Sequence, residues 1–178
     1  GVRDITAIVI THDHPDHLAD VGSLVNLLFE VRKNRGEADR KTSKVEMLLS
    51  RGAFERLYPH IESARDVFRD TVVLKPGTKY NLRSLDGKST LRLQACHALH
   101  LDASHLSSRS GFDSVGLIGE IRDGLKMKGR IGIPSDTKWD KKISREFTER
   151  YPCDLICLHL GSIIPEEFPL ISYFDANK

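Results

Sequence analysis

The sequence predicts a fold of the mixed α/β (α+β) class, in which layers of sheet are covered by helices. A β-branched run at residues 5–10 and a short, mainly apolar run at residues 45–49 are typical of buried strands. Between them, apolar residues recur at three- and four-residue steps, which indicates an amphipathic helix. Two Asp-Gly pairs, at residues 86–87 and 123–124, separate apolar runs and predict β-hairpins. Strands and hairpins mixed with helices of this kind pack as covered sheet layers.

The first half of the chain alternates strands and helices. Ile5–Ile10 is expected to be a strand, and an apolar stripe predicts a helix from about Leu18 to Arg32. Lys33–Lys44 is rich in charge and has no apolar pattern, so we expect an exposed loop. Val45–Leu49 follows as a strand, and Ser50 then opens a short helix.

The second half is richer in strands and turns. Pro76-Gly77 is a turn pair that closes a short strand at residues 72–74. Four-residue steps from Trp139 to Tyr151 predict a helix that Pro152 stops. The remaining expected strands are residues 80–85, 89–95, 115–122, 125–133 and 154–160.

Length and composition indicate one soluble domain spanning residues 1–178, with 39% hydrophobic and 29% charged residues. No apolar stretch reaches the roughly 20 residues that span a bilayer, so no membrane partner is expected. The first residues have no signal-peptide pattern, which favours a cytoplasmic location. The three cysteines (Cys96, Cys153 and Cys157) lie in or beside apolar strands and are interpreted as reduced core thiols. A net charge of +2 neither indicates nor excludes a nucleic-acid partner.

The segment Thr11–His17, directly after the first strand, holds three histidines and two aspartates. Such a patch is costly to bury without partners, and imidazole and carboxylate are the ligands of zinc and similar ions. His12 and His14 can point the same way and hold one ion, because alternate side chains of an extended segment share a side. The adjacent pair Asp16-His17 lies further round the turn, which favours a second ion. The alternative is a solvated polar turn in which Asp16 caps the helix.

The run from Ile8 to His17 resembles the signature of the metallo-β-lactamase-fold hydrolases. That superfamily has an αββα sandwich and usually two zinc ions bridged by a hydroxide. Leu91–His100 resembles the strand that delivers a third histidine, and Ile131–Thr137 resembles the strand and Asp-Thr turn of the bridging aspartate. The resemblance runs from about Asp4 to Leu160.

The resemblance implies a binuclear centre. His12, His14 and His100 would hold one ion, Asp16 and His17 the other, and Asp136 would bridge them. Asp16 and Asp136 are then the catalytic carboxylates. Zinc is the expected metal, with manganese or iron as alternatives.

Two further histidines compete for ligand positions, and no residue is assigned to substrate binding. His97 is the alternative to His100 as the third histidine of the first ion. His159, at the end of the last expected strand, is the candidate for the final ligand, and a structural or substrate-facing role is its alternative.

The family's opening strands have no counterpart before Ile5. We therefore expect the chain to be a partial or truncated copy of a longer protein. The remaining elements would be deleted or supplied by a partner chain, including a second copy in a homo-oligomer.

The expected activity is metal-dependent hydrolysis by a hydroxide between two ions, which lower the pKa of water towards about 7. The signature is most similar to the phosphodiesterase and ribonuclease branches, and the basic residues of Arg32–Lys44 suit a phosphate-rich substrate or nucleic acid. Hydrolysis of a small lactone, thioester or lactam is one alternative. A non-catalytic metal-binding domain is the other.

Overall fold

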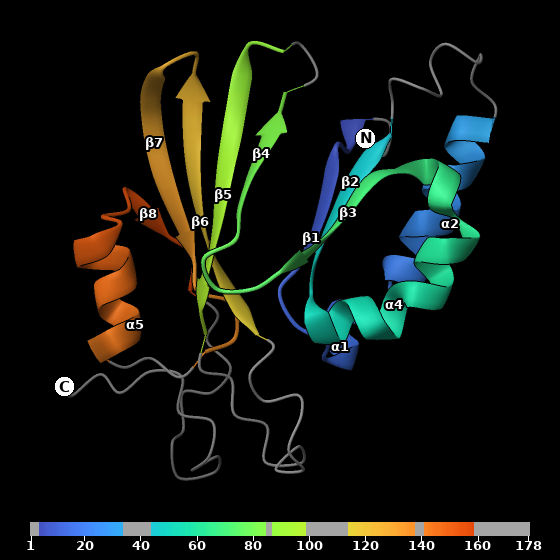
Figure 1. Cartoon of the computed structure of the whole chain (residues 1–178), viewed down its shortest axis with the longest axis horizontal. Coiled ribbons are helices and arrows are strands. Elements are labelled where there is room, and N and C mark those ends of the chain that lie inside the picture. The colour runs from blue at the N-terminus through green and yellow to red at the C-terminus, as the bar shows by residue number, and fades with distance from the viewer. Residues whose placement is uncertain (1–3, 34–43, 85–86, 99–113, 138–140, 159–178) are drawn as a thin grey trace, which may run out of the picture. The chain divides into compact units, whose positions relative to one another are not determined.

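The structure is a computed structural model that describes residues 4–33, 44–84, 87–98, 114–137 and 141–158. His100 and His159 lie outside these residues. The chain divides into two compact units, Gly1–Leu74 (unit 1) and Lys75–Lys178 (unit 2). Figure 1 labels their helices and strands.

The described part of unit 1 contains a parallel sheet with the strand order β1-β2-β3. Parallel neighbours need crossover connections, which are usually helices. Helix α2 lies between β1 and β2 in the sequence, and α4 lies between β2 and β3. The elements of unit 1 are β1 (Ala7–Ile10), α1 (Pro15–Leu18), α2 (Val21–Lys33), β2 (Val45–Ser50), α4 (Arg51–Ser63), η2 (Arg65–Val67) and β3 (Phe68–Leu74).

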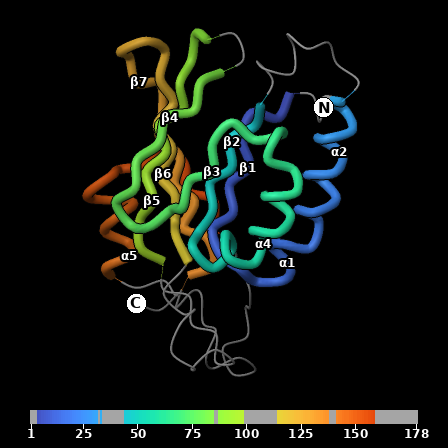
Figure 2. Tube along the Cα trace, turned by 45° about the vertical axis from the view of Figure 1, so that its right-hand side comes forward, coloured from blue at the N-terminus to red at the C-terminus, as the bar shows by residue number. Residues whose placement is uncertain are grey.

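The core of unit 1 lies between this sheet and the helices α2 and α4, which run side by side in Figures 1 and 2. Strand β2 is buried along its whole length, as its apolar run predicts for the central strand of a parallel sheet. Its one charged residue, Glu46, pairs with Arg69 Nη1 at 3.2 Å. Leu28 of α2 and Leu57 of α4 are among the buried residues that complete this core.

Helix α4 begins where the sequence predicts, with Ser50 as its N-cap. The Ser50 hydroxyl accepts a hydrogen bond from the backbone N–H of Ala53 at 3.3 Å. The helix continues through Pro59 to Ser63.

Unit 2 contains a sheet with the order β4-β5-β6-β7-β8. The elements are β4 (Lys79–Arg83), β5 (Ser89–His97), β6 (Val115–Asp123), β7 (Lys126–Ile133), α5 (Lys141–Arg145), η4 (Glu146–Arg150) and β8 (Leu155–Ile156). Strands β4 to β7 pair antiparallel, and β8 pairs parallel to β7. Both expected hairpins are confirmed, and Gly87 and Gly124 take φ values of 68° and 56° that favour glycine.

Helix α5 and the π-helical turn η4 pack on the sheet of unit 2. Ile143 and Phe147 are buried against Cys96 and Ile118. The contact depends on a glycine, because a Cβ atom at Gly132 would lie 2.6 Å from Phe147 Cδ1.

Three expectations are corrected. The helix expected from about Leu18 to Arg32 is α2, which begins three residues later at Val21, and a turn at Ala19 and Asp20 separates it from the additional short helix α1. The helix expected from Trp139 to Tyr151 consists of α5 and η4, with Trp139 outside the described residues. The last expected strand is limited to Leu155–Ile156 within the part that the structure describes.

The cysteines also differ from the expectation. Cys96 is buried and Cys153 half-buried, but Cys157 is exposed just past β8 and is not a core thiol. Across the described residues, no helix combines the length and the apolar character that crossing a membrane requires.

Candidate metal centre

The histidine-rich segment follows the carboxyl end of β1, an edge of parallel sheets where ligands commonly bind. β1 ends at Ile10, and the chain runs without regular structure until Pro15, the first residue of α1. His14 is the N-cap of α1 and has an extended backbone. Its carbonyl accepts a hydrogen bond from the N–H of His17 at 3.0 Å, which turns the chain back.

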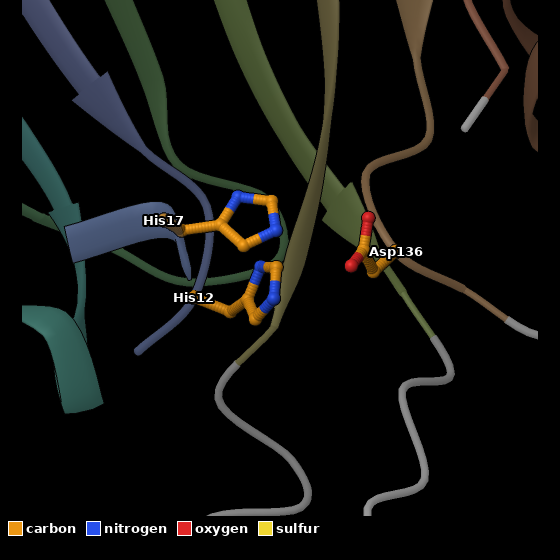
Figure 3. Close-up of side chains that lie close together, drawn as sticks. All are labelled: His12, His17 and Asp136. Carbon is orange, nitrogen blue, oxygen red and sulfur yellow. The ribbon is translucent and has the colours of Figure 1, made fainter. Parts of the chain in front are cut away.

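This turn brings the three imidazoles together. The ring centroids of His12 and His14 lie 4.8 Å apart, and those of His12 and His17 lie 4.0 Å apart. Ring nitrogens of His12 and His17 lie within 4.8 Å of each other, and Figure 3 shows the two rings side by side. The ring of His17 is therefore closer to that of His12 than the ring of His14 is, and the three rings form one cluster.

The orientation of His12 is fixed by its neighbour in the sequence. His12 is 2% exposed, and its Nδ1 lies 3.2 Å from the Thr11 hydroxyl. In the tautomer in which Nδ1–H donates to this hydroxyl, the lone pair is on Nε2. Such an arrangement leads us to expect Nε2 as the metal-binding atom, since a hydrogen bond at one ring nitrogen orients the other.

Asp16 lies beside His17 at the more exposed side of the cluster. Its Oδ2 is 3.4 Å from His17 Nε2, and the two side chains are 72% and 30% exposed. A solvent-facing carboxylate next to an imidazole can serve as a metal ligand or can accept a proton.

Asp13 is a member of the segment to which sequence reasoning gave no role. Its side chain is 15% exposed, and its Oδ2 lies 3.1 Å from Nε of Arg56 on α4. A Cβ atom at Gly52, on the first turn of α4, would lie 3.0 Å from Asp13 Cγ. The segment between His12 and His14 is thus packed against α4. In the sequence, the feature that points to this close contact is Gly52 at the start of the helix.

Asp136 lies in unit 2, after the end of β7, as the sequence predicts for the Asp-Thr turn. Asp136 and Thr137 are 5% and 4% exposed, and Figure 3 includes the Asp136 carboxylate. The preceding Ser135 has a φ of 65°, a left-handed conformation that is uncommon outside glycine. Backbone strain of this kind is concentrated at functional sites.

Of the two competing histidines, His97 ends β5 and is exposed. His100 and His159 lie outside the described residues, so their assignments stay predictions.

The donor set of unit 1 fits a divalent metal ion. Three clustered imidazoles and the neighbouring Asp16 carboxylate are the nitrogen and oxygen donors typical of zinc sites. The fit rests on the chemistry and the closeness of these groups.

Comparison with known proteins identifies the family. A sequence profile described as "Beta-lactamase superfamily domain" matches residues 1–169. The chain belongs to the metallo-β-lactamase superfamily. The two sheets and their helices agree with the αββα fold that the sequence predicts for this superfamily.

Two solved structures are similar to this chain. Isothiocyanate hydrolase from Delia radicum gut bacteria is 18% identical, with a TM-score of 0.48 over 87% of this chain and 50% of its own. Zn(2+)-bound PqqB from Methylobacterium extorquens is 17% identical, with a TM-score of 0.47 over 80% of this chain and 42% of its own. The chain thus spans half or less of the length of these two proteins. No curated protein matches it.

Proposed function

We propose that this member of the metallo-β-lactamase superfamily is a metal-dependent hydrolase with a binuclear centre, acting on phosphodiester substrates. The observation that carries the proposal is the cluster of His12, His14 and His17 at the carboxyl end of β1. Imidazole nitrogens held close together in this position are suited to bind zinc and similar ions.

In this proposal, His12, His14 and His17 supply nitrogen ligands and Asp16 supplies a carboxylate. The family motifs add Asp136 as a bridging ligand, His100 as a further ligand and His159 as the last. Bound divalent ions supply Lewis acidity and lower the pKa of water towards neutrality.

The protein's own residues contribute orientation and proton transfer. The Thr11 hydroxyl orients His12 through Nδ1, and the contact of Asp13 with α4 holds the backbone between His12 and His14. Asp16 is exposed, so its carboxylate can exchange a proton with water while it lies beside His17. Asp16 and Asp136 are the two carboxylates to which we assign catalytic roles.

Metal binding is tested first, by thermal unfolding of the purified chain with and without zinc. A ligand present at 100 times its Kd stabilises the folded state by about 2.7 kcal/mol. For a chain of this size that corresponds to an increase in Tm of about 5–11 °C. We expect this increase for the wild type and its loss in His12→Ala.

The matched control is His60→Ala, which removes an exposed histidine from α4 of the same unit. We expect zinc to stabilise this variant as it stabilises the wild type. Equal zinc responses of all three proteins, or no response at all, would contradict the proposed metal site.

Activity is tested on bis(4-nitrophenyl) phosphate with the metal-loaded chain. Asp136→Asn removes the negative charge of the proposed bridging ligand and is expected to lower kcat at least about 10²-fold, because a bound metal ion contributes several kcal/mol of charge stabilisation in the transition state. A lactone, a thioester and a lactam are assayed in parallel. Turnover of one of these without turnover of the diester would replace the proposed substrate class, and tight zinc binding without any turnover would indicate a non-catalytic metal domain.

A further inference from the structure

A second feature of unit 2 has no part in the proposed metal centre. A groove of about 600 Å³ crosses strands β4, β5 and β6. Four of the side chains that line it are cationic (Lys79, Arg83, Arg92 and Arg122), and its lining contains no carboxylate. We call this feature the basic groove.

Strand pairing explains why these cations gather on one face. Lys79, Asn81 and Arg83 alternate along β4, so their side chains share a face of the sheet. Arg92 of β5 is opposite Asn81, and Thr90 of β5 is opposite both Arg83 and Arg122. The cations therefore occupy three adjacent strands, which lie about 4.8 Å apart in a sheet.

Positive charge exceeds negative charge in this region. Glu120 lies beside the groove and pairs with three guanidinium groups, at 2.8 Å from Arg130, 3.0 Å from Arg122 and 4.0 Å from Arg92. Within the described residues, Lys79 and Arg83 take part in no ion pair. Three guanidinium groups thus share the Glu120 carboxylate, and Lys79 and Arg83 add two further cations.

A second groove in the same unit shows the contrast. It is lined by the cations Lys141, Lys142, Arg145 and Arg150 together with Glu146 and Glu149. Arg150 pairs with Glu146 at 2.9 Å and Arg145 with Glu149 at 3.7 Å. These two ion pairs neutralise two of the four cations in the second groove and leave an excess of two. The lining of the basic groove has four cations and no carboxylate, so its excess of positive charge is larger.

We propose that the basic groove binds the phosphate backbone of a single-stranded nucleic acid. Guanidinium groups form bidentate hydrogen bonds with phosphate, and amide and hydroxyl groups such as those of Asn81 and Thr90 commonly join phosphate and sugar contacts. The choice of a phosphodiester polymer rests on the proposed function. The groove makes the proposed function more specific, because it favours a polymeric substrate over a small one.

The position of the groove within unit 2 supports a polymer. Arg122 is opposite Met127 near the start of β7, and Asp136 follows the other end of this strand. The six residue steps from Met127 to Ile133 span about 20 Å at roughly 3.3 Å per residue. A small diester cannot occupy both ends, but a strand several nucleotides long can.

The test is binding of a fluorescein-labelled 20-nucleotide oligouridylate to the full chain in EDTA, followed by fluorescence anisotropy. Three to four phosphate contacts predict a salt slope of about −2 to −3, so that affinity falls about 20- to 50-fold between 50 and 200 mM KCl. Lys79→Ala/Arg83→Ala is expected to weaken binding at least about tenfold at 100 mM and to make the slope about 1.4 less negative.

Lys141→Ala/Lys142→Ala is the matched control, because it removes the same charge from the second groove of the same unit. We expect it to bind within about twofold of the wild type. Equal losses in both double variants would overturn the proposal, since they would show dependence on net charge alone. Displacement of the oligonucleotide by polyglutamate as readily as by unlabelled oligouridylate would also overturn it, in favour of an acidic polypeptide.

The assay uses metal-free protein, so its outcome is independent of hydrolysis. Groove-dependent binding without turnover of any diester would refute the proposed hydrolase and retain the nucleic-acid site. Turnover of bis(4-nitrophenyl) phosphate without oligonucleotide binding would do the reverse.

Discussion

Replacing Gly52 with alanine tests whether α4 sets the shape of the histidine-rich segment. The new methyl group would lie 3.0 Å from Asp13 Cγ, 3.2 Å from Asp13 Cβ and 3.3 Å from Asp13 Oδ2. Carbon atoms in favourable contact are about 3.5–4.0 Å apart. Asp13 must therefore move by several tenths of an ångström, and it is held in place by its ion pair with Arg56.

Overpacking a well-packed site usually lowers the free energy of unfolding by about 1–3 kcal/mol, and we expect a cost of this size for the movement of Asp13. Alanine also improves helix propensity by up to about 1 kcal/mol relative to glycine. Gly22 provides a control for the second effect, because it is likewise the second residue of a 13-residue helix in unit 1. A Cβ atom at Gly22 has its nearest neighbour, His60 Cε1, at 4.0 Å and causes no clash.

The assay compares Gly52→Ala with Gly22→Ala by thermal unfolding in EDTA. The difference between the variants isolates the clash, and 1–3 kcal/mol corresponds to a Tm about 2–12 °C lower for Gly52→Ala. Zinc competition with a chelator should show 10- to 100-fold weaker binding for Gly52→Ala, the usual effect of disturbing the residues that support metal ligands. A Gly52→Ala protein as stable as Gly22→Ala would refute this reasoning.

Three further predictions concern unit 2. Burial alone would raise the pKa of Glu120, but hydrogen bonds from Arg130 and Arg122 outweigh it and lower the pKa. The stability difference between the wild type and Glu120→Gln, measured by urea unfolding, should therefore be full at pH 6 and shrink as the pH falls below about 4. Ser135→Val should destabilise the fold by about 1–2 kcal/mol in the same assay, because a β-branched residue fits poorly at a φ of 65°, and Ser135→Gly should not. In iodoacetamide labelling followed by mass spectrometry, the exposed Cys157 should react well before Cys96, because burial raises the pKa of the Cys96 thiol to about 12. Equal rates at both cysteines would contradict the assigned burial.

The sequence predicts those parts of the fold that depend on local patterns. β2 and the hairpin of β6 and β7 lie where apolar runs and an Asp-Gly pair place them, since their signals are contained in a few adjacent residues. The length of β8 was not predictable in the same way. An apolar run shows that a strand is favourable, but its extent depends on how far the neighbouring β7 continues to pair with it. The shortness of β8 also explains why Cys157 is exposed, because this residue lies just past β8, which is an edge strand of the sheet.

In the candidate site, too, the features that depend on a short segment are predictable and those that depend on packing are not. His12, His14 and His17 were identified because all three belong to one short segment. The contact of Asp13 with Gly52 and Arg56 was not identified, because it joins segments about 40 residues apart and depends on the packing of α4. A glycine at the start of a helix usually indicates only a position of weak helix propensity. The sequence alone therefore does not show that Gly52 leaves space for the Asp13 carboxylate.

The short helix α1 makes the histidine-rich segment dependent on the rest of unit 1. A four-residue helix is far below the roughly 12–15 residues at which an isolated helix becomes marginally stable, so tertiary contacts must hold it. Its single turn places the ring centroid of His17 4.0 Å from that of His12. The contact of Asp13 with α4 stabilises the preceding part of this turn from outside the segment. The arrangement of the three histidines therefore depends on the packing of α4 as well as on their spacing in the sequence.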